Sequence, residues 1–460
     1  MSKKGITTTM AAVALVVALV VGLGLGYLAW GGPDPSIADL QAQLDAKDAT
    51  IAEKDDAISD LEDVIDEKDA TIAALEAAGL QGEVKIGALM SMSGRLATFG
   101  ENELLAAEFA AEHVNEVLAA AGADWTIKIE VEDTQTDPAI CLEKVESFNA
   151  RGIKLMVGPL SSSELGNIMG YLDENKMIAI SQSSTASSLA IPDDFTFRFC
   201  PGDVLGQGPA IGRIMWDDGI RYVVPCWSGD DWGDGLKESA KDKFVGLGGE
   251  FDEGIRYVPT APEFSAEASQ LNNLVSDAIA TYGADKVGVL NIAFEEVTLL
   301  FTACSEYPAL SSVTWYGSDG TATSQAMLDD PTVAEFAAEV SYPCTIFAPS
   351  ETPKYQALKA HGMAELGREL DSYSYAVYDV VLAYAYSLMV VDTYEAEAVK
   401  EVLPMVTESL YGASGNIQLD AAGDRKAGDY FIWTIKLIEG EYVWVNSGKY
   451  VLATDSASYT

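Results

Sequence analysis

The sequence predicts an α/β protein with two doubly wound, Rossmann-like lobes, preceded by a transmembrane helix and a coiled-coil stalk. Residues 6–30 are uncharged and mostly apolar, and a helix of that length exceeds the roughly 30 Å hydrocarbon core of a bilayer. A seven-residue apolar repeat fills residues 36–78. From Glu83 onward, short apolar runs alternate with longer amphipathic stretches, and this order produces parallel sheets.

The composition excludes several classes of function. The 460 residues include 71 acidic and 28 basic ones, which gives a net charge of -43. Such a surface repels phosphate backbones, so we expect no nucleic-acid partner. The chain has 5 cysteines, without a C-x-x-C pair, and 2 histidines. This set predicts neither a metal site nor a cofactor site.

The charges around the apolar stretch set its orientation. Lys3 and Lys4 precede it, and acidic residues dominate after it. By the positive-inside rule, residues 1–5 lie in the cytoplasm, residues 6–30 cross the cell membrane once, and the bulk of the chain is extracytoplasmic. The alternative is a cleaved signal peptide, whose apolar region usually has only about 7–15 residues.

The stalk prediction rests on two interleaved series of residues. One series is apolar throughout, whereas the second mixes leucine with lysine, and this pattern favours a coiled coil of two parallel strands. It therefore allows a homodimer, and a single solvated helix is the alternative. The first series is Ile37, Leu44, Ile51, Ile58, Ile65 and Ile72, and the second is Leu40, Lys47, Lys54, Leu61, Lys68 and Leu75.

The loops that follow the apolar runs are where a ligand site is expected, because open parallel sheets bind ligands beyond the carboxyl ends of their strands. Hydroxyl groups gather in residues 158–164 and 181–186. Aromatic residues and carboxylates gather in residues 227–235 and 291–296. Free amides and hydroxyls at the start of a helix hold anions such as carboxylates, although simple helix capping also explains the serines.

Taken together, these loops resemble the type I periplasmic binding proteins, in particular the leucine/isoleucine/valine-binding group that serves ABC importers. The resemblance implies two lobes joined by three crossover strands near residues 199–203, 340–344 and 429–435. It places lobe 1 at about 83–201 and 344–430, and lobe 2 at about 202–343 and 431–455. The motifs that carry it are IGALMSMSG at 86–94 with Phe99-Gly100, Asp133 with Asp137-Pro138, GPLSSS at 158–163, WGDG at 232–235 and GSDG at 317–320.

The resemblance also implies roles for individual residues. Hydroxyls at the positions of Ser162, Ser183 and Thr185 would bind the carboxylate of an amino acid. An acidic residue at the position of Asp319 would meet its ammonium group. Aromatic residues from both lobes would cover the ligand, at the positions of Phe99, Trp232 and Phe294.

These expectations describe a membrane-anchored solute-binding protein that passes an amino acid or amide to an ABC permease. A ligand-sensing ectodomain that acts through a partner signalling protein is the alternative. We expect no enzyme, because no histidine lies in a pattern that would activate a nucleophile and no Walker-type loop is present in the sequence. Two further interpretations concern single residues. Arg95 is expected on the surface, and Tyr373 is expected in the core of a lobe.

Overall fold

The computed structural model describes residues 37–76 and 79–460. The predicted membrane anchor, residues 6–30, lies outside the described residues. The chain divides into an N-terminal unit and a compact unit that begins at Gly79. In the described ranges, one helix has the length and hydropathy of a membrane span. It is Ser372–Val391, and most of it is buried inside the compact unit, as expected for a core helix.

The N-terminal unit contains α2 (Ile37–Glu76), a helix of 40 residues that confirms the helical character of the stalk segment. Within residues 38–66, the part of the helix whose side chains are described, the predicted apolar seam is exposed. Leu44, Ile51 and Leu61 keep 54%, 55% and 61% of their surface exposed. Exposed apolar residues at regular spacing usually mark a contact surface.

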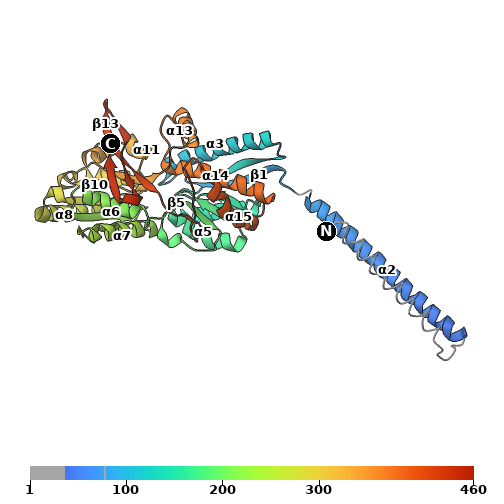
Figure 1. Cartoon of the computed structure of the whole chain (residues 1–460). Coiled ribbons are helices and arrows are strands. Elements are labelled where there is room, and N and C mark those ends of the chain that lie inside the picture. The colour runs from blue at the N-terminus through green and yellow to red at the C-terminus, as the bar shows by residue number, and fades with distance from the viewer. Residues whose placement is uncertain (1–36, 77–78) are drawn as a thin grey trace. The chain divides into compact units, whose positions relative to one another are not determined.

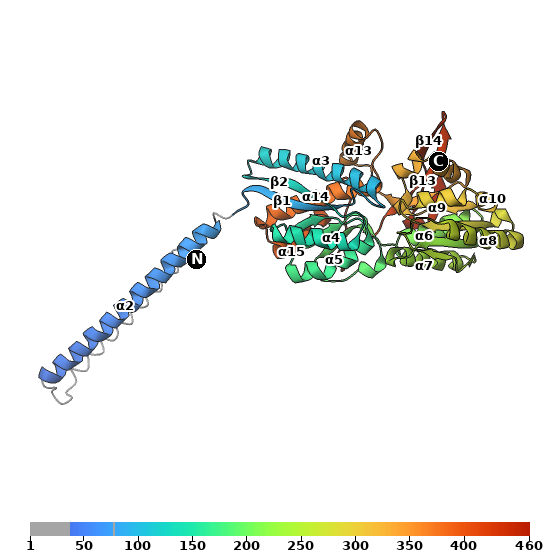
Figure 2. The same ribbon diagram turned by 180° about the vertical axis from the view of Figure 1, so that it is seen from behind.

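The first lobe is built on a parallel six-stranded sheet with the order β12-β5-β4-β3-β1-β2. Figures 1 and 2 show α3, α5, α14 and α15 around this sheet. The strands are β1 (Gly82–Met90), β2 (Trp125–Asp133), β3 (Leu155–Val157), β4 (Ile178–Ser181), β5 (Thr196–Pro201) and β12 (Asp424–Arg425). The helices are α3 (Ala97–Ala121), α4 (Pro138–Ala150), α5 (Ser162–Asn175), α13 (Pro353–Glu365), α14 (Ser372–Val391) and α15 (Ala396–Ser409).

The second lobe carries a parallel five-stranded sheet with the order β10-β9-β6-β7, in which β8 also pairs with β6. Its strands are β6 (Tyr222–Ser228), β7 (Glu250–Phe251), β8 (Ile255–Tyr257), β9 (Val287–Ile292) and β10 (Thr314–Tyr316). Its helices are α6 (Gln207–Asp217), α7 (Asp231–Gly246), α8 (Ser265–Tyr282), α9 (Val297–Cys304), α10 (Pro308–Ser311), α11 (Gln325–Asp329) and α12 (Pro331–Glu339).

A third sheet, which the alternation of strands and helices did not predict, is antiparallel with the order β11-β13-β14-β15. Glu439 and Gly440, between β13 and β14, both have positive φ angles, as a tight hairpin turn requires. The strands are β11 (Cys344–Ala348), β13 (Asp429–Ile438), β14 (Glu441–Val451) and β15 (Ser456–Tyr459).

Local signals in the sequence explain where the helices begin. Asp137 accepts hydrogen bonds from the amides of Ala139 and Ile140, and Pro138 occupies the first turn of α4. Ser161 and Glu164 form a reciprocal capping box at the start of α5. These side chains satisfy amides that a helix cannot satisfy internally, so they fix the points at which the two helices leave the ends of their strands.

The chain passes between the lobes at three places in the described compact unit. It leaves the first sheet after β5 and enters α6, returns through β11 to α13 and α14, and crosses again from β12 to β13. The second crossing strand therefore lies at Cys344–Ala348, slightly later than the expected residues 340–344. The two parallel sheets are therefore joined by three connections.

Candidate functional site

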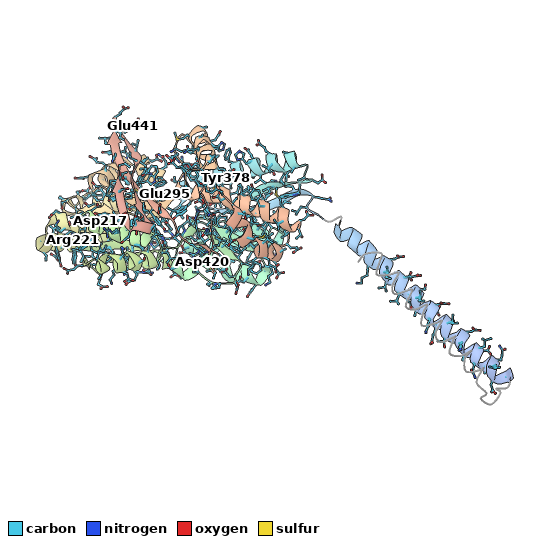
Figure 3. The ribbon with its side chains drawn as sticks, viewed as in Figure 1. Asp217, Arg221, Glu295, Tyr378, Asp420 and Glu441 are labelled. Atoms are coloured by element: carbon cyan, nitrogen blue, oxygen red, sulfur yellow. The ribbon has the colours of Figure 1, made fainter. Side chains whose placement is uncertain are left out.

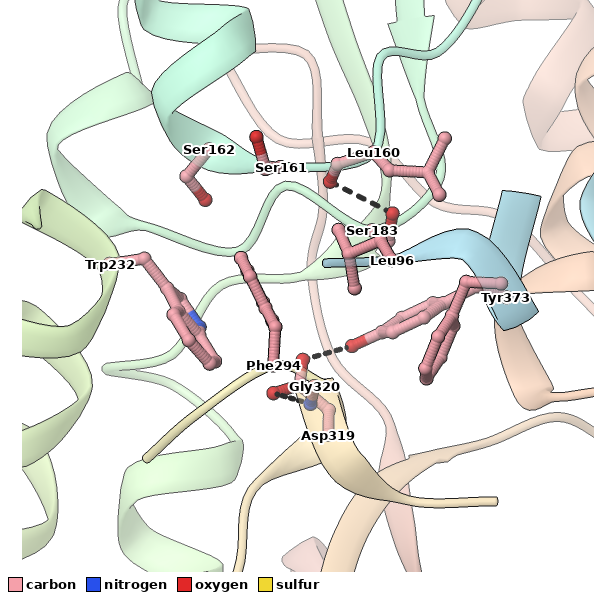
Figure 4. A pocket seen from close by; sticks show the side chains of 11 residues that line it. Leu96, Leu160, Ser161, Ser162, Ser183, Trp232, Phe294, Asp319, Gly320 and Tyr373 are labelled. Atoms are coloured by element: carbon pink, nitrogen blue, oxygen red, sulfur yellow. Dashed lines mark hydrogen bonds between the residues drawn. The ribbon is translucent and has the colours of Figure 1, made fainter. Parts of the chain in front are cut away.

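The carboxyl ends of strands from both parallel sheets meet around one narrow cavity of about 20 Å³. The loops after β1, β3 and β4 form the side that belongs to the first lobe, and the loops after β6, β9 and β10 form the opposite side. Figure 4 shows the side chains that line it. They are Leu96, Phe99, Leu160, Ser161, Ser162, Ser183, Trp232, Phe294, Asp319, Gly320 and Tyr373.

Six of the seven residues that the sequence analysis selected line this cavity. The seventh, Thr185, does not line it. Thr185 is buried, and its hydroxyl has no hydrogen-bond partner among the described residues. The six lining residues are Phe99, Ser162, Ser183, Trp232, Phe294 and Asp319.

The hydroxyl end of the cavity is held in place by contacts with the main chain. The Ser183 hydroxyl donates to the carbonyl of Leu160 over 3.0 Å (Figure 4). The Ser162 hydroxyl accepts from the amide of Ala186 over 3.1 Å, so its own proton is free to donate to a ligand. Ser162 is also the first residue of α5, whose N-terminus carries the positive end of the helix dipole. This end of the cavity therefore suits a carboxylate.

Gly158 lets the loop after β3 pass close to β1. A Cβ atom at this position would lie 2.3 Å from the carbonyl oxygen of Leu89, and the φ angle is +93°. Only glycine adopts this conformation without strain, so it sets the path of the chain toward Ser161 and Ser162.

The acidic end of the cavity is Asp319, which is only 4% exposed. The Tyr373 hydroxyl donates to Asp319 Oδ2 over 2.6 Å, and the amide of Gly320 donates to Oδ1 over 3.0 Å (Figure 4). Burial raises the pKa of Asp319 to about 6, while these hydrogen bonds oppose the rise. At neutral pH the group is mainly ionised, and it lies beside the cavity without a bound cation among the described side chains.

An aromatic pair covers the second-lobe side. The rings of Trp232 and Phe294 are stacked, with centroids 4.5 Å apart and an interplanar angle of 14°. Gly320 makes room for this pair, because a Cβ atom there would lie 2.4 Å from Phe294 Cδ1. Leu96 and Phe99 add apolar surface from the first lobe, so the middle of the cavity suits an apolar group.

The loop after β9 also joins the two lobes outside the cavity. Glu295, labelled in Figure 3, donates its amide to the carbonyl of Arg95 over 3.0 Å. Its carboxylate accepts from the Ser324 hydroxyl over 2.9 Å, and Thr98 and Ala97 at the start of α3 lower its pKa. The first residue of α3 has no side-chain cap from its own lobe, since Leu96 occupies that position. Glu295 therefore places a carboxylate near the N-terminus of a helix of the opposite lobe.

One expectation about a single residue was wrong. Arg95 is not a solvated surface residue, because its guanidinium lies 3.6 Å from Glu296 and over the ring of Phe294 at 5.1 Å. Tyr373 is buried in the core, as expected, and it also belongs to the cavity wall. Both side chains meet the opposite lobe, a contact that no local pattern in the sequence reveals.

Other candidates for chemistry lie away from the cavity wall. The residues that the structure describes contain no group of three or more His, Cys, Asp or Glu arranged to hold a metal. All five cysteines are buried and free in this part of the chain. His113 bonds to the Tyr378 hydroxyl, and His361 stacks on Phe109, so both histidines take part in packing on the first lobe.

Two lobes that enclose a small cavity between the ends of their parallel strands define a solute-binding protein. The chain belongs to the periplasmic binding protein family, whose profile matches residues 83–441. It is 34% identical over 370 residues to an uncharacterized protein of Methanocaldococcus jannaschii, a match that covers 76% of this chain and 87% of that one.

Solved structures share the fold. A leucine-binding protein, LivK, from Thermotoga maritima superposes with a TM-score of 0.64 at 19% identity, over 79% of this chain and 97% of that one. LivJ from Streptococcus pneumoniae is a branched-chain amino acid transporter substrate-binding protein that was solved with isoleucine. It superposes with a TM-score of 0.65 at 18% identity, over 79% of this chain and 100% of that one. A solute-binding protein of an ABC transporter from Rhodopseudomonas palustris was solved with p-hydroxybenzoic acid. It superposes with a TM-score of 0.62 at 17% identity, over 78% of this chain and 95% of that one.

Proposed function

We propose that the protein is the extracytoplasmic solute-binding component of an ABC importer and that it captures a small amino acid, branched-chain or related, between its lobes. The observation that carries this proposal is the polarity of the cavity. Serine hydroxyls and the N-terminus of α5 stand at one end, and the carboxylate of Asp319 stands at the other. A zwitterion with an apolar side chain is complementary to both ends and to the aromatic wall between them.

The charge of Asp319 favours an amino acid over an aromatic acid. The related protein from Rhodopseudomonas palustris was solved with p-hydroxybenzoic acid, a ligand that has no ammonium group. Such a ligand would place a carboxylate in the same cavity as Asp319 and supply no positive charge to compensate it.

Closure of the lobes supplies the signal to the permease. The contacts of Arg95 and Tyr373 with the second lobe exist only when the lobes are together. A ligand that touches both walls favours this state, because it adds contacts that the open state lacks. The permease would then recognise the closed form.

The N-terminal segment would keep the binding unit at the membrane surface. We propose residues 6–30 as an uncleaved anchor and residues 36–78 as a coiled coil that pairs two copies of the chain. The exposed apolar residues of α2 support the pairing, because a single helix leaves these side chains exposed to water and a second helix would cover them. Sedimentation of the full-length protein in detergent should give a dimer, and Ile51→Asp with Ile58→Asp should give a monomer. A monomeric wild-type protein would contradict the pairing.

A thermal-shift screen of the full-length protein tests the proposed ligand class. Neutral, acidic and basic amino acids, amides and 4-hydroxybenzoate are the probes. A ligand that binds the native state alone raises Tm, so we expect the largest rise with a small apolar amino acid such as L-leucine or L-isoleucine. A rise with 4-hydroxybenzoate and with no amino acid would contradict the proposal.

A further inference from the structure

Glu103 is a buried acid on α3 that joins this helix to the loop after β4. It is 0% exposed, and so is its partner in that loop, Gln182. Glu103 Oε2 accepts a hydrogen bond from the side-chain amide of Gln182. The other oxygen of each group, Glu103 Oε1 and Gln182 Oε1, has no partner among the described residues. An acid and an amide thus meet through one hydrogen bond, and each leaves one buried oxygen unsatisfied.

The two residues are next to residues of the cavity wall along the chain. Phe99 lies one turn before Glu103 on α3 and lines the cavity. Ser183 follows Gln182 and also lines the cavity, where its hydroxyl donates to the carbonyl of Leu160. The hydrogen bond between Gln182 and Glu103 therefore connects two segments that shape the first-lobe side of the site.

Glu103 receives fewer hydrogen bonds than the two buried acids that act on it, Asp371 and Glu164. Asp371 accepts from two side chains and from two main-chain amides at the start of α14. Glu164 accepts from both the hydroxyl and the amide of Ser161. Hydrogen bonds donated to a carboxylate stabilise its charge. When buried acids lie close together, the one with the fewest donors is the one that keeps its proton, and this is Glu103.

The electrostatic surroundings of Glu103 act in the same direction. Burial raises the pKa of Glu103 well above its ordinary range, and the charges of Asp371 and Glu164 raise it further, while the hydrogen bond from Gln182 opposes the rise. Arg95 lowers the pKa of Glu164 and lies against Glu296. The charged groups that face Glu103 from α5 and α14 are therefore acidic, so a neutral carboxyl group is favoured at this position.

We propose that Glu103 is a positioning residue that keeps its proton at neutral pH and pairs with Gln182 through two hydrogen bonds, which fix the loop after β4 at the ligand cavity. A protonated carboxyl group has one O–H donor. Gln182 Oε1 belongs to the amide that is already bonded to Glu103, and it lacks a donor. The second bond satisfies both remaining oxygens at once. This inference rests on the proposed function and deepens it, because it assigns the support of the hydroxyl end to an uncharged pair.

An exchange of the acid and the amide tests the pair. Gln182→Glu alone places a second acid against Glu103 and removes the N–H donor. Glu103→Gln keeps a donor, because its amide N–H takes the place of the O–H group. The double variant with both changes has one acid and one amide again, in the opposite order. Glu108→Gln, at an exposed position of the same helix, is the matched control.

Three measurements on the full-length protein at pH 7 follow the exchange. Calorimetry with L-leucine measures affinity, and thermal unfolding without ligand measures Tm. Infrared difference spectroscopy between the wild type and Glu103→Gln detects the carbonyl band of a protonated carboxylic acid. The infrared measurement reports the proton itself, which the loss of a merely structural contact would not change.

We expect Gln182→Glu to weaken L-leucine binding by roughly tenfold or more and to lower Tm. The double variant should recover both, with an affinity within about threefold of wild type. Glu103→Gln and Glu108→Gln should bind like wild type, and only Glu103→Gln should lose the band of the protonated acid.

Two results would overturn the inference and leave the proposed function standing, provided that the wild type binds L-leucine. One is an infrared spectrum that Glu103→Gln leaves unchanged, because Glu103 would then be ionised. The other is a double variant that binds as weakly as Gln182→Glu or does not fold, because the acid and the amide would then not act as a pair. A wild type that does not bind L-leucine would overturn the proposed function and the role of Glu103 in it.

Discussion

The Tyr373 hydroxyl donates a 2.6 Å hydrogen bond to Asp319 Oδ2 and so joins the start of α14 in the first lobe to the loop after β10 in the second. The bond orients the carboxylate beside the cavity and exists only in the closed arrangement. Since Tyr373 is itself oriented by the turn that Asp371 caps, the acidic end of the site is held from the first lobe as well as the second.

Tyr373→Phe should weaken amino-acid binding by roughly three- to tenfold. The carboxylate of Asp319 loses the hydrogen bond from Tyr373 but keeps the one from the amide of Gly320. The ring remains, so the packing of α14 is preserved. Calorimetry with L-leucine measures the loss. Tyr375→Phe is the control, because Tyr375 is buried on the same helix but its hydroxyl has no partner among the described residues. Equal losses in both variants would assign the effect to helix packing.

Glu295→Gln should destabilise the closed state specifically. The carboxylate of Glu295 near the N-terminus of α3 contributes roughly 1 kcal/mol through the helix dipole, and the amide of glutamine interacts less well with that dipole. We expect the L-leucine affinity to fall about fivefold while Tm without ligand stays close to wild type. Glu335→Gln, on the exposed face of α12, is the control. If Tm without ligand falls in Glu295→Gln, then Glu295 stabilises the folded protein in general and not the closed state of the two lobes.

Gly320→Ala should disrupt the aromatic wall. The new methyl group would lie 2.4 Å from Phe294 Cδ1 and 2.5 Å from the carbonyl oxygen of Ala293, so the stacked pair of Phe294 and Trp232 must move. Tryptophan fluorescence and L-leucine binding should both change. Gly170→Ala, in the middle of α5 with no atom near the added methyl group, should instead stabilise the protein by about 0.5–1 kcal/mol.

The protein should be more stable at pH 5 than at pH 7.5. Burial raises the pKa of Asp194, Asp319 and Asp379 to about 6 each, above the value of 3.8 expected in an unfolded chain. Between these limits the native state binds more protons than the unfolded state, so stability falls as pH rises from about 4 to about 6. The net charge of -43 acts in the same direction, and added salt should raise Tm at pH 7.5.

Unfolding followed by circular dichroism at pH 5 and 7.5 checks this expectation, and Asp194→Asn should reduce the difference between the two Tm values. A higher Tm at pH 7.5 would contradict the prediction. It would mean that hydrogen bonds and nearby charges stabilise the ionised form of these carboxylates by more than burial destabilises it.

The sequence predicted the parts of the site that depend on local patterns. Apolar runs followed by serine- or glycine-rich turns identified the loops after β3, β4 and β10, because strand-to-helix turns have a characteristic composition. The family resemblance that these turns carry then selected Ser162 and Asp319. The antiparallel hairpin of β13 and β14 was missed, since the search for alternating strands and helices favours parallel sheets.

The residues that sequence reasoning missed act across the hinge. Tyr373 lies in an apolar tyrosine-rich stretch that indicates a core helix, and only the closed arrangement brings it to Asp319, 54 positions away in the chain. Glu295 was expected near the cleft with the other carboxylates of residues 291–296, but its main-chain contact with Arg95 of the first lobe has no local signal in the sequence.

The most direct test of the central claim is calorimetric titration of wild-type protein and Asp319→Asn with L-leucine at pH 7. The change keeps the shape of the side chain and removes its negative charge, so the aromatic wall and the serine end stay intact. The account predicts saturable binding by the wild type and a loss of at least about tenfold in the variant. Binding of equal affinity in both proteins would contradict the assignment of Asp319 to the ligand's ammonium group and the proposal of a zwitterionic ligand.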